Sequence, residues 1–191
     1  MKGIVWQNVR MFLWMTLLTG VFYPLLVTLI AQVGMKEKAE GELITLHGKT
    51  VGAMAIAQKF EKEIYFWPRP SAIDYNPLPS GGSNLGPISL GLKKAVQERK
   101  ERLLKAYGMD EKGEIPPEFL FASGSGLDPH ITIPAAYFQI ARIAKARGIE
   151  EKAVRGLVDE MHIKPRFAPR AKGYVNVLAL NLLLDKRLSG E

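Results

Sequence analysis

Hydrophobic residues are concentrated near the start of the chain, where Met11 to Val33 forms 23 consecutive residues without a charged side chain. A helix of about 20 apolar residues spans the hydrocarbon core of a bilayer. Trp6 and Trp14 lie near one end of this run, and tryptophan is favoured at membrane interfaces. A cleaved signal peptide has a shorter apolar core of about 7–15 residues. The pattern therefore predicts a membrane-spanning helix that anchors the rest of the chain.

The apolar run also contains residues that suit packing against other helices. Proline removes one helical hydrogen bond, so we expect a kink between Gly20 and Pro24. Small and hydroxylated residues let neighbouring helices approach closely and form hydrogen bonds across their interface. The residues that we assign to membrane-helix packing are Thr16, Thr19, Gly20, Tyr23 and Pro24.

The pattern beyond residue 34 is that of a soluble α+β domain. A polar connector at 35–42 precedes two short apolar segments, 43–46 and 50–54, which flank His47-Gly48-Lys49 and predict a β-hairpin. Apolar residues at helical spacing predict helices over 91–107, 134–147, 150–162 and 174–188. We therefore divide the chain into residues 1–34 (N-terminal tip and membrane helix), 35–42 (connector) and 43–191 (one soluble domain).

Particular residues define these helices and one further strand. Gly108 and Gly148 are fitting helix stops, because glycine readily adopts the left-handed conformation that ends a helix. Residues 119–122 form a short apolar run after two prolines and are a candidate buried strand. The expected apolar stripe of the 134–147 helix is Ala136, Ile140, Ile143 and Ala144, and that of the last helix is Val177, Leu180, Leu184 and Leu188.

Charge and cysteine content exclude some functions and leave others open. Lys and Arg outnumber Asp and Glu by 26 to 19, but the basic residues are scattered among acids, which argues against nucleic-acid binding. The absence of cysteine excludes disulfides, thiol nucleophiles and Cys-based zinc sites. Basic residues are nearly balanced on the two sides of the apolar run, so charge does not decide the orientation of the anchor.

Two glycine-rich loops are the candidate site of chemistry. The first covers residues 65–87 and the second residues 122–131. Neither has the Gly-Lys-Ser/Thr ending of a P-loop or a dinucleotide fingerprint. A hydrolase nucleophile elbow has glycine two positions before and two positions after its serine, but around Ser125 these positions are Ser123 and Leu127. His47, His130 and His162 lie in separate segments without a zinc-ligand spacing, so no metal site is predicted and His130 is interpreted as a loop residue bonded to backbone.

These loops are interpreted as turn-forming and partner-binding. Glycine supplies left-handed turns, and Asn84 or Asp128 can bond to local backbone. We expect Trp67, Arg69 and Tyr75 to be exposed and to act as interface anchors. The residues that we assign to partner contact or to defining the loop fold are Trp67, Arg69, Ser80, Gly81, Gly82, Asn84, Ser123, Gly124, Ser125, Gly126, Asp128 and His130.

The segments also resemble a known family. Tyr-Phe-Trp-Pro-Arg-Pro-Ser-Ala at 65–72, Ser-Gly-Gly-Ser-Asn-Leu-Gly-Pro at 80–87 and Ala-Ser-Gly-Ser-Gly-Leu-Asp-Pro-His-Ile at 122–131 are similar to patterns of the C subunit of the Kdp potassium-transporting ATPase. Val-Asn-Val-Leu-Ala-Leu-Asn-Leu at 175–182 and parts of the apolar run agree as well. The hairpin at 43–54 departs most from the family pattern.

The resemblance implies a non-catalytic subunit of a potassium pump. Its partners would be an ATP-hydrolysing P-type subunit, a potassium-channel-like subunit and a small accessory subunit, which handle ATP and potassium themselves. The N-terminus would be cytoplasmic and the domain extracytoplasmic, with a catalytic-chaperone role that raises the ATP affinity of the pump subunit. The alternatives are a subunit that contributes directly to nucleotide binding and a membrane-tethered hydrolase that uses Ser125.

Overall fold

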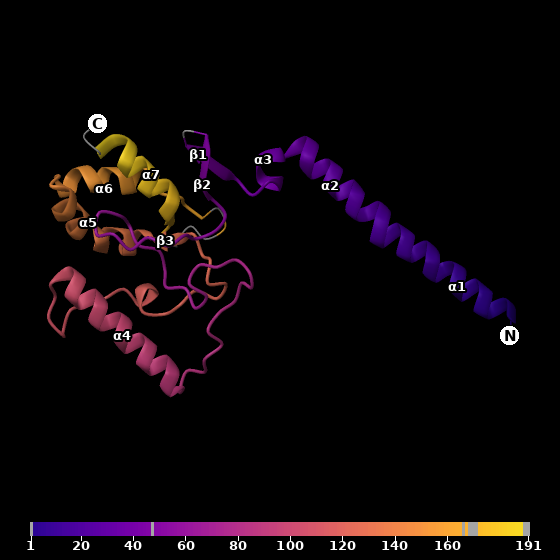
Figure 1. Cartoon of the computed structure of the whole chain (residues 1–191), viewed down its shortest axis with the longest axis horizontal. Helices are drawn as coiled ribbons and strands as arrows, with labels where there is room; N and C mark the ends of the chain where they lie inside the picture. The colour runs from indigo at the N-terminus through magenta and orange to yellow at the C-terminus, as the bar shows by residue number, and fades with distance from the viewer. Residues whose placement is uncertain (1, 47, 166, 168–171, 189–191) are drawn as a thin grey trace. The chain divides into compact units, whose positions relative to one another are not determined.

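The computed structural model describes residues 2–46, 48–165, 167 and 172–188. The chain separates into two compact units, Met1–Val51 and Gly52–Glu191, which are described one at a time. Figure 1 shows the elements of both units along the chain.

The first unit begins with a long apolar helix. It consists of α1 (Lys2–Leu17), a π-helical stretch at Leu18–Phe22, and α2 (Tyr23–Gly34). Within it, Gly3–Gly34 is 32 residues long and apolar enough to cross a membrane. Where the sequence predicted a kink, the Tyr23 N–H bonds to the Leu18 carbonyl, five residues earlier. This wider bonding pattern lies just before Pro24, which has no N–H to continue the α-helical ladder.

A short helix and a hairpin follow the apolar helix, and the second strand of the hairpin crosses the boundary between the two units. Helix α3 (Lys36–Ala39) is followed by β1 (Leu43–Leu46) and β2 (Lys49–Ala53), which pair in a two-stranded sheet. Gly48 has a φ of +75°, a conformation that glycine adopts at little cost, so the predicted glycine turn is confirmed. His47 lies outside the described residues.

The second unit is a helical domain with one small sheet. Strand β3 (His130–Thr132) pairs antiparallel with β4 (Tyr174–Asn176), with Ile131 opposite Val175. The remaining elements are α4 (Leu90–Tyr107), a 3₁₀ turn at Pro117–Phe119, α5 (Ile133–Arg147), α6 (Glu151–Glu160) and α7 (Val177–Leu188). In Figure 1, α5, α6 and α7 lie together, with β3 beside them. The predicted α+β class is confirmed.

A capping side chain begins α5, and glycine residues end α4 and α5. The Thr132 side chain accepts a hydrogen bond from the Ala135 N–H, 3.4 Å away, and caps the start of α5. Gly108 (φ 60°) and Gly148 (φ 68°) end α4 and α5 in the left-handed conformation, as predicted. The expected stripe of α5 is confirmed, because Ala136, Ile140, Ile143 and Ala144 are all buried in the core.

Two predicted elements differ from the structure. Residues 119–122 are not a strand, because the Leu120 and Phe121 N–H groups bond back to the Pro117 carbonyl and close a local turn. Phe119 nevertheless enters the core and is 4% exposed. The last helix was predicted over 174–188 but begins three residues later, at Val177. Residues Tyr174–Asn176 instead form β4, which pairs with β3.

Candidate functional site

The backbone of Phe66 and Trp67, in the aromatic segment at 64–67, pairs with side chains instead of a neighbouring strand. Asn181 of α7 accepts from the Phe66 N–H (2.8 Å) and donates to the Phe66 carbonyl (3.0 Å). Gln139 of α5 does the same for Trp67, at 2.8 and 3.1 Å. Both amides are almost fully buried, so they satisfy backbone groups that would otherwise be left without partners in the core.

Trp67 is part of the core, so the expectation that it is exposed is wrong. Its side chain is 8% exposed, and the indole N–H donates to the Lys62 carbonyl at 3.0 Å. The Arg142 guanidinium lies 4.0 Å from the ring centroid, which is cation–π geometry. The side-chain amides of Asn181 and Gln139 bind the backbone of Phe66 and Trp67 and hold Trp67 in the core. Because these partners are far away in the sequence, the residues around Trp67 do not indicate its burial.

The two glycine-rich loops lie against each other. The Gly81 N–H donates to the Ser125 carbonyl at 3.0 Å, and the Ser123 N–H donates to the Pro70 carbonyl at 3.0 Å. A Cβ atom at Gly82 would lie 2.8 Å from the Gly124 carbonyl oxygen. The loops therefore approach at backbone distance, and glycine is required because a side chain would separate them.

An ion pair joins the start of the first loop to the end of the second. Arg69 Nη1 donates to Asp128 Oδ2 at 2.9 Å, and both side chains are about one-third exposed. The other oxygen, Oδ1, accepts from the His130 N–H at 3.1 Å. The Tyr75 hydroxyl donates to the Arg69 carbonyl at 2.9 Å. Arg69 and Tyr75 are therefore half-buried bridging residues, and the expectation that they are freely exposed is wrong.

Ser125 and His130 have separate surroundings. Ser125 Oγ accepts from the Leu127 N–H at 3.1 Å, while the His130 ring packs edge-on against Tyr174 at 4.8 Å. Burial lowers the pKa of His130, and the nearby Asp128 charge offsets only part of this effect. Among the described residues no hydrogen bond joins Ser125 to His130, so the structure does not assemble a Ser-His-Asp constellation.

The far end of the first loop is exposed. Ser80 and Asn84 lie at the surface, and Asn84 has a positive φ of 49°. Next to them, Leu78, Ile88 and Leu90 are 81%, 97% and 83% exposed. A groove of about 370 Å³ runs from Ile88 and Leu90 along α4 to Phe121. We call the exposed residues Leu85, Ile88, Leu90 and Phe121 the apolar patch.

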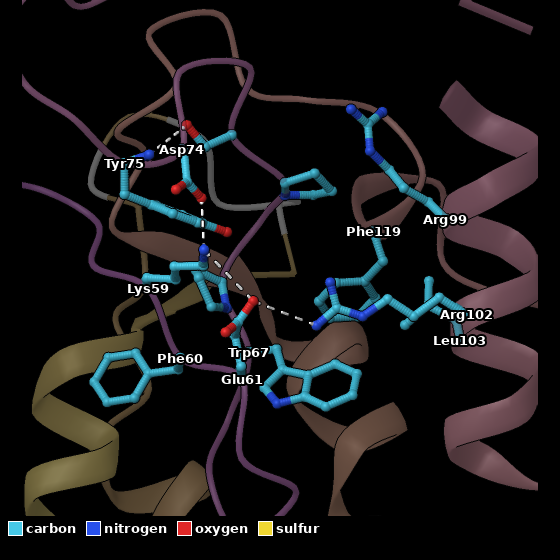
Figure 2. Close-up of a pocket in the computed structure, with 13 residues that line it drawn as sticks. Lys59, Phe60, Glu61, Trp67, Asp74, Tyr75, Arg99, Arg102, Leu103 and Phe119 are labelled. Atoms are coloured by element: carbon cyan, nitrogen blue, oxygen red, sulfur yellow. Dashed lines mark hydrogen bonds and ion pairs between the residues drawn. The ribbon is translucent and has the colours of Figure 1, made fainter. Parts of the chain in front are cut away.

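A pocket of about 320 Å³ lies between the first loop and α4. Figure 2 shows Trp67 and Phe119 at its base, with Arg99 and Arg102 reaching in from α4. On the opposite side, Lys59 Nζ lies 2.9 Å from Asp74 and 3.6 Å from Glu61. Burial raises the pKa of Tyr75, which also lines the pocket, to about 12. The pocket is therefore aromatic at its base and charged around its opening.

The remaining predictions concern a metal site and the residues of the apolar helix. Within the described residues, no group of three His, Asp or Glu side chains is arranged to hold a metal ion. In the apolar helix, the Thr19 hydroxyl donates to the Met15 carbonyl at 2.7 Å. The other residues that we assign to membrane-helix packing, Thr16, Gly20, Tyr23 and Pro24, are exposed along the helix. Their role in packing stays a prediction.

Three buried residues that hold the first loop in place were not predicted from the sequence. Gln139, Arg142 and Asn181 are polar yet lie on otherwise apolar helix faces, and each is buried. Arg142 donates to the Glu63 carbonyl and, at 3.0 Å, to the Tyr65 carbonyl. A polar residue within an apolar stripe is the signal that could have indicated them, since buried polar groups require partners.

The structure defines a class of protein with an apolar helix of membrane-spanning length and an α+β domain that carries paired glycine-rich loops. The sequence profile described as "K+-transporting ATPase, c chain" (KdpC) matches residues 5–186. The chain belongs to this family.

Curated relatives named potassium-transporting ATPase KdpC subunit agree with this assignment. The protein of Leptospira interrogans is 42% identical over 183 residues, covering 96% of this chain and 94% of that protein. The one of Dechloromonas aromatica is 44% identical over 188 residues, covering 97% and 98%. The one of Cereibacter sphaeroides strain KD131 is 47% identical over 172 residues, covering 90% of each. The similarity therefore extends through both loops and the apolar helix.

Proposed function

We propose that this chain is the accessory C subunit of a high-affinity, ATP-driven potassium uptake complex and is needed for its assembly and activity. The observation that carries the proposal is the end-to-end similarity to KdpC subunits, including one apolar helix of membrane-spanning length. Its partners are the ATP-hydrolysing P-type subunit, the potassium-channel-like subunit and a small accessory subunit. The chain itself is non-catalytic.

The proposed topology is a single-pass protein of the cell membrane. The N-terminus is cytoplasmic, and the domain after the helix is extracytoplasmic. An outer domain cannot touch cytoplasmic ATP, so its catalytic-chaperone effect on the pump subunit's ATP affinity is a conformational coupling between distinct sites.

Direct nucleotide binding by the glycine-rich loops is the alternative. A phosphate-binding loop presents free backbone N–H groups to its ligand. Here the Gly81 N–H is bonded to the Ser125 carbonyl, and the Gly126 N–H to the Ser123 carbonyl at 3.2 Å. These bonds favour a structural role for the loops over a phosphate cradle.

The Glu101→Cys variant tests the topology. The natural chain has no cysteine, so this single thiol is labelled uniquely, and Glu101 lies exposed on α4. We expect a membrane-impermeant maleimide to label it in intact cells as completely as in lysed cells. Labelling only after lysis would place the domain in the cytoplasm and favour direct nucleotide contact. Saturable binding of ATP to the purified full chain would contradict the coupling proposal even if the domain is outside.

A further inference from the structure

The pocket between the first loop and α4 has the size and lining of a small-ligand site. Its volume of about 320 Å³ lies at the lower end of the range for ligand pockets, roughly 300–1,000 Å³. Trp67, Leu103 and Phe119 form an apolar base, and each is less than 9% exposed. These side chains are held by the core, so the base is formed before any ligand arrives.

The charged side chains around the pocket do not neutralise one another completely. Lys59, Arg99 and Arg102 face Glu61 and Asp74, which leaves one positive charge. Asp74 forms an ion pair with Lys59 at 2.9 Å, and this hydrogen bond raises the pKa of Lys59. Glu61 is shared, at 3.6 Å from Lys59 and 3.9 Å from Arg102, and both distances exceed that of a charge-assisted hydrogen bond.

Arg99 is the pocket cation that has no part in these ion pairs among the described residues. In the part of the chain that the structure describes, it donates one hydrogen bond, to the Leu120 carbonyl at 2.8 Å, although a guanidinium carries five N–H donors. Among the described residues, no carboxylate forms an ion pair with Arg99. In Figure 2 the chain of ion pairs runs from Asp74 through Lys59 and Glu61 to Arg102, and Arg99 stands apart from it.

The two arginines line the pocket from the same face of α4. Arg99 and Arg102 are three residues apart on α4, and residues at this spacing lie on the same helix face. The Arg102 guanidinium also lies 5.5 Å from the Trp67 ring centroid, which keeps it over the apolar base. Guanidinium groups match the planar geometry of a carboxylate and bind it through paired hydrogen bonds.

We propose that this pocket binds one organic carboxylate, whose charged group lies between Arg99 and Arg102 and whose apolar stem rests on Trp67. A single negative charge matches the one positive charge that the lining leaves, whereas a doubly charged phosphate exceeds it. The carboxylate belongs either to a free organic acid or to an acidic side chain of another subunit. The first source is independent of the proposed function, and the second rests on it.

Binding of a free acid is tested on the full chain in detergent. Trp6→Phe and Trp14→Phe leave Trp67 as the single tryptophan, so its emission reports on the pocket. The probes are butyrate, its neutral isostere butyramide and inorganic phosphate, at constant ionic strength. We expect a saturable change with butyrate and none with butyramide. Arg99→Gln or Arg102→Gln should raise the dissociation constant about tenfold or more, because a charge-assisted hydrogen bond is lost.

Matched controls separate the pocket from general charge effects. Lys94→Gln removes the same charge from an exposed position on α4 and should leave butyrate binding unchanged. Arg102→Gln guards against misfolding of Arg99→Gln, because Arg102 is 61% exposed and has no backbone bond to lose among the described residues. Saturation by phosphate at a lower concentration than by butyrate would overturn the assignment to a singly charged carboxylate.

A partner's side chain is tested in the assembled complex. Glu61→Cys places a thiol at the exposed rim of the pocket, and labelling is measured on this chain before and after assembly. Protection on assembly that is lost in Arg99→Gln supports a carboxylate from a partner. Failure of both butyrate binding and Arg99-dependent protection overturns the proposal. Failure of assembly itself would contradict the proposed function and leave the butyrate result to decide the pocket.

Discussion

Gly126 is the residue where backbone conformation and packing both exclude a side chain. Its φ is +71°, and a Cβ would lie 2.6 Å from Ile73 and 2.8 Å from the Gly81 carbonyl. Gly124, two residues earlier, has open space around it. We expect Gly126→Ala to lower the free energy of unfolding by about 1–3 kcal/mol and Gly124→Ala to cost much less. Urea unfolding of the two variants would show this, and equal midpoints would contradict it.

His130 should make the domain less stable in mild acid. Burial holds its folded pKa below the ordinary value of 6.5, so between these two values the unfolded chain binds more protons than the folded chain. The free energy of unfolding contributed by this group therefore falls as the pH drops below about 6.5, and it is constant above that value. We expect the urea midpoint to fall less between about pH 7.5 and pH 5.5 in His130→Asn than in the unchanged chain. An identical fall would show that His130 does not contribute.

Residues whose role is local were predictable, and those with distant partners were not. Gly108 and Gly148 end helices as the sequence indicated, because a left-handed cap depends on the glycine itself. Trp67 was misplaced because its burial depends on Gln139, which lies 72 positions further along the chain. A single sequence does not reveal such a pairing, although an amide within an apolar stripe indicates that a buried partner exists.

At the scale of elements, amphipathic helices were predicted well and short strands poorly. The 3.6-residue pattern defines α4, α5 and α6 from within, since each helix supplies its own backbone partners. A three-residue strand such as β4 is defined only by pairing with β3, and residues 119–122 have the same apolar character but close a turn instead. The pocket could not be predicted for the same reason, because it is formed by α4, a loop and the 3₁₀ turn, which are distant in the sequence.

The apolar patch at the start of α4 is the surface that we expect to dock on another subunit. Ile88 and Leu90 are 97% and 83% exposed, and exposed apolar clusters mark interaction sites. Ile88→Ser should weaken co-purification of the complex several-fold while leaving the urea midpoint unchanged. Phe167, which lies outside this patch and is 99% exposed, is the matched control. Equal losses for Ile88→Ser and Phe167→Ser would contradict a specific role for the patch.

For the whole molecule, the proposed function gives the apolar helix two separable tasks. The first proposed task is to tether the domain to the membrane, which raises its effective concentration near the partner subunits. The second proposed task is to pack against another helix through Thr16, Gly20 and Tyr23, which are exposed along the helix. The first task needs only length and hydrophobicity, whereas the second needs these particular residues at close contact.

Replacing residues 11–33 by an unrelated single membrane helix of equal length separates the two tasks. We expect the swapped chain to reach the membrane but to recover less complex than the natural chain, because the small and hydroxylated face is lost. Gly20→Leu should reproduce much of this defect, since a Cβ there meets nothing within 4 Å in the chain itself and its bulk is felt only by a partner. Val21→Leu adds bulk at the next position and should be neutral. Full potassium-limited growth and normal co-purification in the swapped chain would show that the helix is a tether alone, with assembly resting on the domain.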